Sequence, residues 1–312
     1  MMEESTGRKR KGIQLAYPFE ERRLLNQGRF QTKWSPPYLV QPKLNGERCR
    51  VIREEGICLL LSSTEELILS VPHIQQWCLT NLPNGEFDGE LYKHGWTWAE
   101  IHSVVSRSVD LHSNYGEMEL HLFDWPSRNE PQLMRSVELR KLITTIDIRT
   151  LGGPIKLVNS HVANNLEEVY QLYDRFIGEG YEGFIIRELS APYERKRSGA
   201  MMKFKPKQTD HYKIVGCYEA ISEDGTPKGI LGGFNCIDDM QTRFQVGAGK
   251  LNHDERRIIW NRYISCGNIG GDLLEVEYQT LSDKNKVPLF SRAVRIISPE
   301  SPILGSAPFD LN

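Results

Sequence analysis

The sequence predicts an α+β protein of two domains, in which a domain of mixed helices and strands precedes a small β-barrel. The chain has 312 residues, and this length suits about two domains at the usual ~150 residues each. Apolar side chains recur at helical spacing over residues 166–177, which predicts a helix in the first domain. After Pro206, short β-rich runs alternate with glycine-containing turns, as in small barrels. The domain boundary is therefore expected near residues 207–211.

Several strands are predicted in the first domain. Residues 38–40 open a strand that Pro42 is expected to break. Residues 48–52 and 57–61 flank a Glu-Glu-Gly turn, which predicts a hairpin. Residues 118–123 alternate apolar and polar side chains, the pattern of a half-buried strand.

The predicted helix is followed by a buried strand and then by the barrel. Asn164 or Asn165 would cap the helix at its start, and two nearby glycines would end it. The apolar run at residues 183–187 predicts the buried strand. The barrel strands are expected at residues 213–218, 233–237, 243–246 and 274–278, with one helix near residues 253–262.

The composition is typical of a globular protein and excludes several classes. With 39% hydrophobic and 26% charged residues, the chain differs from disordered, collagen-like and disulfide-scaffold sequences. No apolar run approaches the ~18 residues of a membrane helix, and no apolar stretch follows the basic N-terminus as in a secretory signal. The six cysteines form no C-x-x-C pair, which fits reduced cytoplasmic thiols and gives no zinc-site spacing.

Positive charge is concentrated in two segments, although the whole chain has a net charge of −2. Residues 1–50 carry a net charge of +6 and residues 191–208 a net charge of +5, whereas residues 51–190 carry −10. The two basic segments could meet on one face and hold a polyanion such as nucleic acid, or they could be unrelated solvated stretches.

Two charged stretches contain glycine beside a predicted strand. In residues 43–48, K-L-N-G-E-R, the glycine permits a close approach of a ligand and the outer cations could grip a phosphate. A plain surface hairpin is the alternative. Farther on, Glu86, Asp88 and Glu90 share one face of a strand, where a metal, a ligand hydroxyl or a cation could lie between them. A solvated acidic edge is the alternative for that group.

Two later stretches combine charge with apolar strands. Glu182 leads into the buried strand that Arg187 ends, so its carboxylate could hold Mg²⁺ or belong to a plain turn. Lys203 and Lys205 alternate with apolar residues and therefore point to one face. Two neighbouring ammonium groups repel each other unless an anion lies between them, so a phosphate site competes here with a solvated face.

The order of these stretches is more specific than any one of them. K-x-N-G-x-R, D-G-E, E-G-F-x-x-R and K-x-K follow one another and precede the barrel. In this order the chain resembles the covalent nucleotidyltransferases, most closely the small ATP-dependent DNA ligases of the kind that phages encode. The resemblance extends from residue 36 to residue 300.

The resemblance implies a nucleotidyltransferase domain of antiparallel sheets flanked by helices over residues 1–208, with residues 1–35 as a basic tail or cap. An OB-fold barrel would follow over residues 209–312. The implied function is an ATP-dependent DNA ligase that seals nicks between a 5′-phosphate and a 3′-hydroxyl in duplex DNA, through AMP bound to Lys43. Such an enzyme would act as a monomer away from membranes, in the cytoplasm or, if phage-encoded, in the cytoplasm of the host.

The resemblance also implies a catalytic set, and lysine chemistry explains its composition. The set is Lys43, Arg48, Lys203 and Lys205. A free lysine has a pKa of ~10.4 and is protonated at neutral pH, so the nucleophile Lys43 needs desolvation or cationic neighbours. The other three cations would provide those neighbours and counter the charge of the phosphates.

Nucleotide and metal binding would use further side chains. Beyond the catalytic set, the implied nucleotide ligands are Gln41, Glu90, Phe123, Glu182, Arg292 and Arg295. Phe123 would stack on adenine, Gln41 would read the adenine edge, and Glu90 would accept a hydrogen bond from a ribose hydroxyl. Glu182 and Glu90 would hold Mg²⁺, with Mn²⁺ as a possible replacement.

The chain departs from the family pattern in three places. Asn45 stands where the family usually has aspartate, Ser-Ser-Thr at residues 62–64 replaces an arginine motif, and residues 290–295 keep two arginines of a blurred final motif. A missing negative charge at Asn45 would hold Lys43 less strongly as a cation. Alternatively, Asn45 merely supports the turn before Gly46.

Other readings remain open on the sequence. An RNA ligase shares the lysine and carboxylates but usually lacks this barrel. A capping guanylyltransferase would need an R-x-D-K motif that is absent near Arg292 and Arg295, and an NAD-dependent ligase would need a longer chain with a cysteine zinc site. A non-catalytic nucleic-acid-binding module would keep the barrel without needing Lys43. The nucleotide that labels the protein covalently separates these classes.

Overall fold

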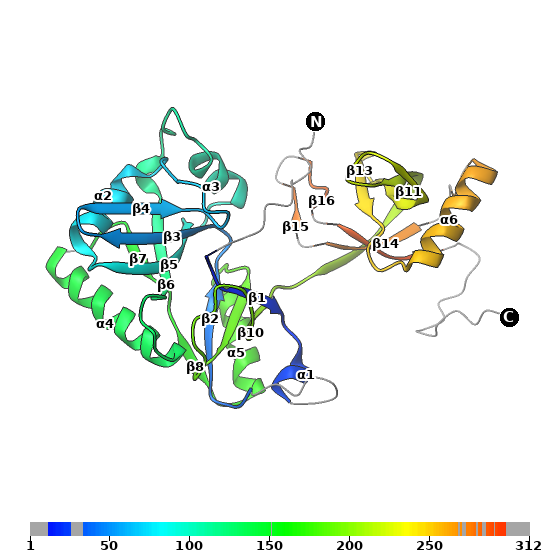
Figure 1. The fold of residues 1–312 in the computed structure, drawn as a ribbon. Coiled ribbons are helices and arrows are strands. Elements are labelled where there is room, and N and C mark those ends of the chain that lie inside the picture. The colour runs from blue at the N-terminus through cyan, green and yellow to red at the C-terminus, as the bar shows by residue number, and fades with distance from the viewer. Residues whose placement is uncertain are drawn as a thin grey trace. The chain divides into compact units, whose positions relative to one another are not determined.

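The computed structural model describes residues 12–25, 34–150, 152–267, 269, 273–278, 280–282, 285–289 and 291–297. The chain forms two compact units, Met1–Lys205 and Pro206–Asn312 (Figure 1). The first unit contains two five-stranded sheets and the second a closed barrel of five strands.

The first sheet of unit 1 carries the strand that ends in Lys43. Its order is β1 (Leu15–Pro18), β10 (Arg197–Phe204), β9 (Gly183–Glu188), β2 (Tyr38–Lys43) and β8 (His161–Ala163). Helix α5 (Leu166–Gly178) covers one face, where Val169 and Phe176 pack with Phe184 and Met202 in a buried cluster. The opposite face of the central strands carries Gln41, Lys43 and Lys203 beside apolar side chains such as Leu39.

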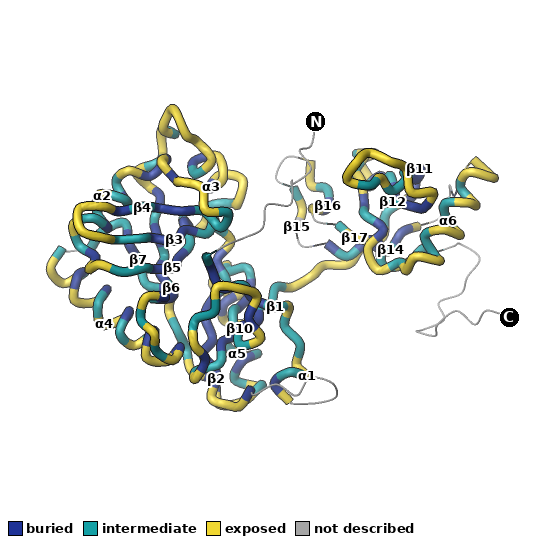
Figure 2. Tube along the Cα trace, in the orientation of Figure 1, coloured by how far each residue is buried: buried dark blue, intermediate teal, exposed yellow. Residues whose placement is uncertain are grey.

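The second sheet of unit 1 has the order β4 (Ile57–Leu61), β3 (Glu47–Glu54), β5 (Gly85–Tyr92), β6 (Glu119–Asp124) and β7 (Ile155–Leu157). Helices α2 (Pro72–Asn81), α3 (Trp98–Val105) and α4 (Gln132–Thr150) contribute to its core, and the 3₁₀ turn η1 spans Tyr115–Glu117. Side chains alternate in burial along β6, as the sequence predicts. Figure 2 shows buried segments along these strands and exposed segments in the loops.

Most predicted elements of unit 1 are confirmed, with one correction. Asn165 caps α5, since its side chain accepts a hydrogen bond from the Glu168 amide. The expectation that Pro42 breaks its strand is wrong, because β2 continues to Lys43. The ladder to β8 ends at Val40, so Pro42 has a strand neighbour on one side only, where a missing N–H is tolerated.

The N-terminal segment is partly integrated into unit 1. Strand β1 pairs in parallel with β10, and the short helix α1 (Glu21–Leu24) follows it. Residues 12–25 of the expected basic tail are therefore part of the folded unit, as a capping element would be. Residues 1–11 and 26–33 of that expectation lie outside the described part of the chain.

Unit 2 is a closed barrel, which confirms the predicted OB-like fold. Its strands, in barrel order, are β11 (Gln208–Ile221), β12 (Pro227–Ile237), β13 (Arg243–Gly247), β17 (Arg292–Ile297) and β14 (Leu273–Tyr278). Helix α6 (His253–Cys266) packs against it, and β15 (Thr280–Leu281) pairs with β16 (Pro288–Leu289). Phe234, Val246 and Leu274 are among the buried side chains that fill the interior.

Two expectations from the composition, on membrane helices and on disulfides, can be checked on the described residues. No helix among them is both long and apolar enough to cross a membrane. All six cysteines are described and none is in a disulfide; five are buried and Cys266 is exposed.

Candidate active site

The candidate site begins at the carboxyl end of β2, where Lys43 lies beside Glu182. The Lys43 Nζ forms an ion pair with Glu182 Oε2 and donates a hydrogen bond to the Leu44 carbonyl at 3.3 Å. The Nζ of Lys205 lies 2.9 Å from Glu182 Oε1. One carboxylate thus binds two ammonium groups, one at the end of β2 and one directly after β10.

Two glycines allow the backbone to approach closely enough for this arrangement. Gly183 lies opposite Lys43 in the β2–β9 register and has a φ of +150°. A Cβ at Gly183 would overlap the Phe204 carbonyl oxygen, and a Cβ at Gly46 would overlap the Leu91 carbonyl oxygen. At both motif positions the space beside the charged residues is too small for a side chain, so glycine is required.

Glu182 is held in its anionic form. Burial alone would raise its pKa, but the charges and hydrogen bonds of Lys43 and Lys205 lower the pKa below its ordinary value. The anion is available at neutral pH as a partner for a cation or as a proton acceptor.

The second sheet places Arg48 and Glu90 directly opposite each other, on adjacent strands and on one face. Burial raises the pKa of Glu90 to about 7, although Lys43 and Arg48 act in the opposite direction. Glu90 can therefore gain or lose a proton near neutral pH, unlike Glu182.

Arg48 is fixed by the buried Asp88. Its Nε donates to Asp88 Oδ1 at 2.6 Å, and its Nη2 donates to Asp88 Oδ2 and to the Gln14 carbonyl at 3.3 Å. Burial disfavours the charged guanidinium, but Asp88 more than compensates and raises the pKa of Arg48. Within the described residues Nη1 donates no hydrogen bond, so this nitrogen is available to a ligand.

Phe123 lies on this face by regular alternation along β6, since His121, two residues earlier, pairs with Glu90. Asp88 pairs with Asp124 and Gly89 pairs with Leu122, so Phe123 is the extra residue of β6. The guanidinium carbon of Arg48 lies 4.7 Å from its ring centroid and that of Arg187 lies 5.4 Å away. The bulge follows Phe123 and changes which residue pairs with Asp88.

Gln41 lies in a buried polar network behind Phe123. Its Nε2 donates to Ser160 Oγ at 2.9 Å and to the Phe123 carbonyl at 3.4 Å, and its Oε1 accepts from Arg187 at 3.0 Å. The amide nitrogen of Gln41 thus uses its hydrogens within the protein. Its Oε1 accepts one hydrogen bond from the described residues and has a second lone pair left.

The structure brings most of the expected site residues into unit 1, but two lie elsewhere. Lys203, Ile185 and Gln41 are cross-strand neighbours, so Lys203 shares the face of Gln41 and Lys43. Arg292 and Arg295 belong to the barrel of unit 2, where Arg295 Nε lies 2.5 Å from Glu275.

Two of the departures from the family pattern lie in loops at strand ends. Asn45 is exposed and makes no hydrogen bond with any described residue, and both interpretations of this position stay predictions. Where an arginine motif was expected, the Ser62 hydroxyl accepts hydrogen bonds from the amides of Thr64 and Glu66 and stabilises a turn.

Sequence reasoning gave no role to two residues that support the site, although Arg187 ends one of the motifs. Arg187 joins Gln41 to the buried Asp124, whose Oδ2 lies 3.0 Å from Arg187 Nη1. Tyr193 donates a hydrogen bond to Asp88 Oδ2 at 2.6 Å. The only sequence signal for Tyr193 was an aromatic residue inside the basic segment 191–208.

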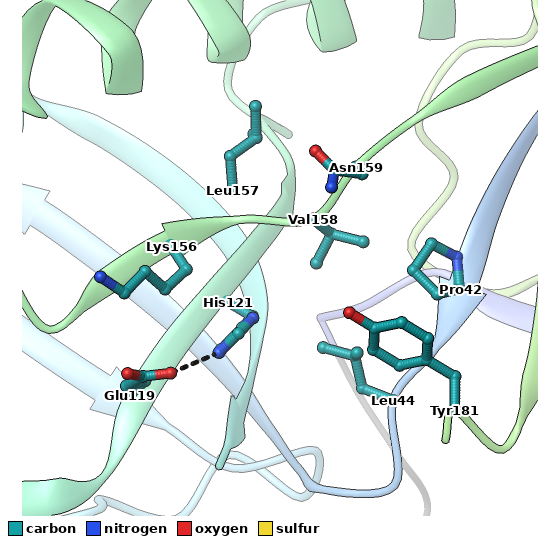
Figure 3. A pocket seen from close by; sticks show the side chains of 9 residues that line it. All are labelled: Pro42, Leu44, Glu119, His121, Lys156, Leu157, Val158, Asn159 and Tyr181. Carbon is teal, nitrogen blue, oxygen red and sulfur yellow. Dashed lines mark hydrogen bonds and ion pairs between the residues drawn. The ribbon is translucent and has the colours of Figure 1, made fainter. Parts of the chain in front are cut away.

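A pocket of about 280 Å³ lies in unit 1 (Figure 3). Pro42 and Leu44, which flank the lysine, line it together with His121, Lys156 and Tyr181. None of the residues expected to bind nucleotide lines this pocket, but it adjoins the candidate site, since its His121 pairs with Glu90 and its Tyr181 precedes Glu182.

Comparisons with known proteins agree with this geometry. Residues 28–205, more than half of the chain, match the family model described as ATP dependent DNA ligase domain. The DNA ligase of African swine fever virus is 28% identical over 281 residues, which cover 84% of this chain and 64% of that protein. The DNA ligase of Enterobacteria phage T4 is 37% identical over 118 residues, or 36% of this chain and 24% of that protein.

A solved structure from a structure–function analysis of Lig E DNA ligases shares the fold. It has a TM-score of 0.71 at 20% identity and covers 91% of this chain and 98% of its own. The chain belongs to the ATP-dependent DNA ligase domain family, which confirms the resemblance seen in the sequence. It spans 64% of the length of the African swine fever virus ligase, less than two thirds.

Proposed function

We propose that this protein is an ATP-dependent DNA ligase that seals 5′-phosphate/3′-hydroxyl nicks through AMP carried on Lys43. The observation that supports this most is the pairing of Lys43 and Lys205 with one carboxylate, Glu182. Family membership supports ATP as the nucleotide.

In the first step, Lys43 Nζ forms a P–N bond with the α-phosphorus of ATP, and the bond to pyrophosphate breaks. The ammonium must first lose a proton, and the Glu182 carboxylate is the acceptor in direct contact with it. Lys205, Lys203 and the open Nη1 of Arg48 then stabilise the negative charge on the phosphoryl oxygens.

Two further transfers complete the reaction. The 5′-phosphate of the nick attacks the AMP phosphorus, and the bond to Lys43 breaks. The 3′-hydroxyl then attacks the activated 5′-phosphate, AMP leaves and the strand is sealed. Residues 1–208 would carry the nucleotidyl transfers, and the barrel over 209–312 would help to hold DNA.

The side chains around Lys43 match the parts of adenosine. Phe123 offers a ring face to the base, and the remaining lone pair of Gln41 Oε1 suits the adenine 6-amino group, which is a donor, and not the guanine 6-oxygen. Glu90, opposite Arg48, can accept a hydrogen bond from a ribose hydroxyl.

The carboxylates fit Mg²⁺ or Mn²⁺ only together with the phosphates of ATP. Glu182 is anionic and supplies the hard oxygen that these cations prefer, with Glu90 as a second donor. The described residues contain no group of three or more potential metal ligands. The cation would neutralise phosphate charge when it is bound.

The remaining partners follow from the same proposal. Nicked duplex DNA is the substrate, and the protein acts as a monomer. The six unpaired cysteines support a reducing compartment such as the cytoplasm, which would be that of a host if a phage encodes the chain.

Nick sealing with separate nucleotides tests the proposal. The protein should seal a nicked DNA duplex with ATP and not with GTP or NAD. Lys43→Ala should lose sealing with ATP but still seal a nick that is already adenylylated, since that step no longer needs the nucleophile. Sealing only of nicks in RNA would favour an RNA ligase, and DNA binding without any nucleotide transfer would favour a non-catalytic module.

A further inference from the structure

The loop between β9 and β10 places Tyr193 against the polar face of the second sheet. Its hydroxyl donates to Asp88 Oδ2 at 2.6 Å and accepts from the Gln14 amide at 2.9 Å. Burial and the nearby Asp88 charge raise the pKa of Tyr193 well above its ordinary value. The hydroxyl therefore remains a proton donor throughout the working pH range.

Asp88 connects Tyr193 to Arg48. The Asp88 side chain is completely buried, and its two oxygens accept Nε and Nη2 of Arg48 in a bidentate pair. The Tyr193 hydroxyl binds the oxygen that also accepts Nη2. A bidentate pair fixes the plane of the guanidinium relative to the carboxylate, so a group that fixes the carboxylate also fixes the guanidinium.

The direction of the guanidinium matters because only one of its nitrogens is available. Nε and Nη2 of Arg48 are bonded to protein, and Nη1 is open among the described residues. A small rotation of the Asp88 carboxylate would turn Nη1 away from a phosphate oxygen without removing any charge from the site. Preorganised donors of this kind act mainly on the transition state.

We propose that Tyr193 is a positioning residue that orients Arg48 through Asp88 for transfer of AMP to Lys43. This role rests on the proposed ligase function. Gln14, just before β1, holds the other side of the Tyr193 hydroxyl, so the N-terminal segment takes part in the same chain of hydrogen bonds.

Tyr193→Phe tests the role because it removes only the hydroxyl. The ring lies 5.7 Å from the guanidinium carbons of both Arg135 and Arg195, and these contacts remain. We expect single-turnover transfer of AMP from ATP to slow about tenfold at saturating ATP, as for the loss of a hydrogen bond to a charged group. The ATP concentration for half-maximal rate should change less than about twofold.

A double-mutant cycle separates positioning from a general structural role. In an Arg48→Lys background, where the bidentate pair is already lost, Tyr193→Phe should slow transfer less than about twofold. Tyr170→Phe is the matched control, since its hydroxyl donates to the Glu21 carboxylate elsewhere in unit 1. That variant should transfer AMP at the wild-type rate.

Two results would overturn the positioning role while leaving the ligase function intact. One is a wild-type rate in Tyr193→Phe. The other is a full tenfold slowing in the Arg48→Lys background as well. A wild-type protein that forms no AMP adduct would instead overturn the proposed function, and this role with it.

Discussion

At the scale of single residues, the two site carboxylates have opposite environments. Glu182 lies between two ammonium groups and is anionic, whereas burial raises the pKa of Glu90 to about 7. A fixed anion suits contact with the nucleophile and a cation. A carboxyl near its pKa suits a hydrogen bond with a neutral hydroxyl. The difference comes from neighbours and not from residue type.

Glu90 makes the stability of the protein depend on pH. The unfolded chain releases this proton near the ordinary value of 4.5, and the folded protein holds it until about pH 7, so this group lowers the free energy of unfolding as the pH rises through that window. Glu90→Gln removes the titration. We expect the free energy of unfolding of this variant, relative to wild type, to increase by about 3 kcal/mol between pH 4.5 and pH 8.

Urea denaturation of both proteins across this pH range measures the effect. Glu100→Gln is a suitable control, because hydrogen bonds from Thr97 lower the pKa of Glu100 and the difference should therefore have the opposite sign. A pH-independent difference for Glu90→Gln would contradict a raised pKa.

Asn45 is expected to have no electrostatic effect on Lys43. Its side chain is exposed and unbonded among the described residues. Asn45→Asp should therefore give the same pH–rate profile for lysine adenylylation as wild type. An upward shift of the profile, with altered Mg²⁺ dependence, would restore the charge interpretation.

The sequence could predict which charged residues gather in the site but not what supports them. Lys43, Glu182 and Lys205 sit at strand ends, and strand alternation assigns their faces. The partners of Arg48 could not be predicted in the same way. Asp88 lies on the neighbouring strand, but Tyr193 comes from a loop 105 residues away whose path depends on tertiary packing.

At the scale of elements, two backbone features depend on tertiary strand pairing and not on local sequence. The bulge at Phe123 and the continuation of β2 through Pro42 both depend on which neighbouring strands are present. A single sequence does not disclose strand order, so neither feature could be predicted from it. Regular elements such as α5, with its cap at Asn165, are set by local sequence and were predicted.

Gly183 is expected to be essential to the packing of β9 against β10. Gly183→Ala would place a methyl group against the Phe204 carbonyl at a φ of +150°, so it should lower the free energy of unfolding by about 2 kcal/mol. Gly199→Ala in β10 is the matched control, since a Cβ there meets nothing within 4 Å. Equal stability of the two variants in urea would show that space at Gly183 is not limiting.

At the scale of the whole molecule, charge segregation points to a polyanionic substrate. The segment 191–208 includes Lys203 and Lys205 of the site, and the other basic segment includes Lys43 and Arg48. Lys43 and Lys205, one from each basic segment, meet at Glu182, and the binding of a polyanion by this region stays a prediction. The first eleven residues carry additional lysines and arginines.

DNA affinity should be largely electrostatic and should fall steeply with salt. Each phosphate contact contributes a slope of about −0.9 in a plot of log affinity against log salt concentration. Deletion of residues 1–11 should make that slope shallower, if these residues touch DNA. Fluorescence anisotropy with a nicked duplex measures both slopes, and identical slopes would exclude the first eleven residues from the interface.

The central claim is that Lys43 carries AMP, and peptide mapping tests it most directly. The wild-type protein is incubated with ATP labelled at the α-phosphate and Mg²⁺, digested, and the labelled peptide is sequenced by mass spectrometry. AMP should be found on Lys43, and Lys43→Arg should acquire no label, because its guanidinium stays protonated and is not a nucleophile. Label on any other residue, or label retained in Lys43→Arg, would contradict the account.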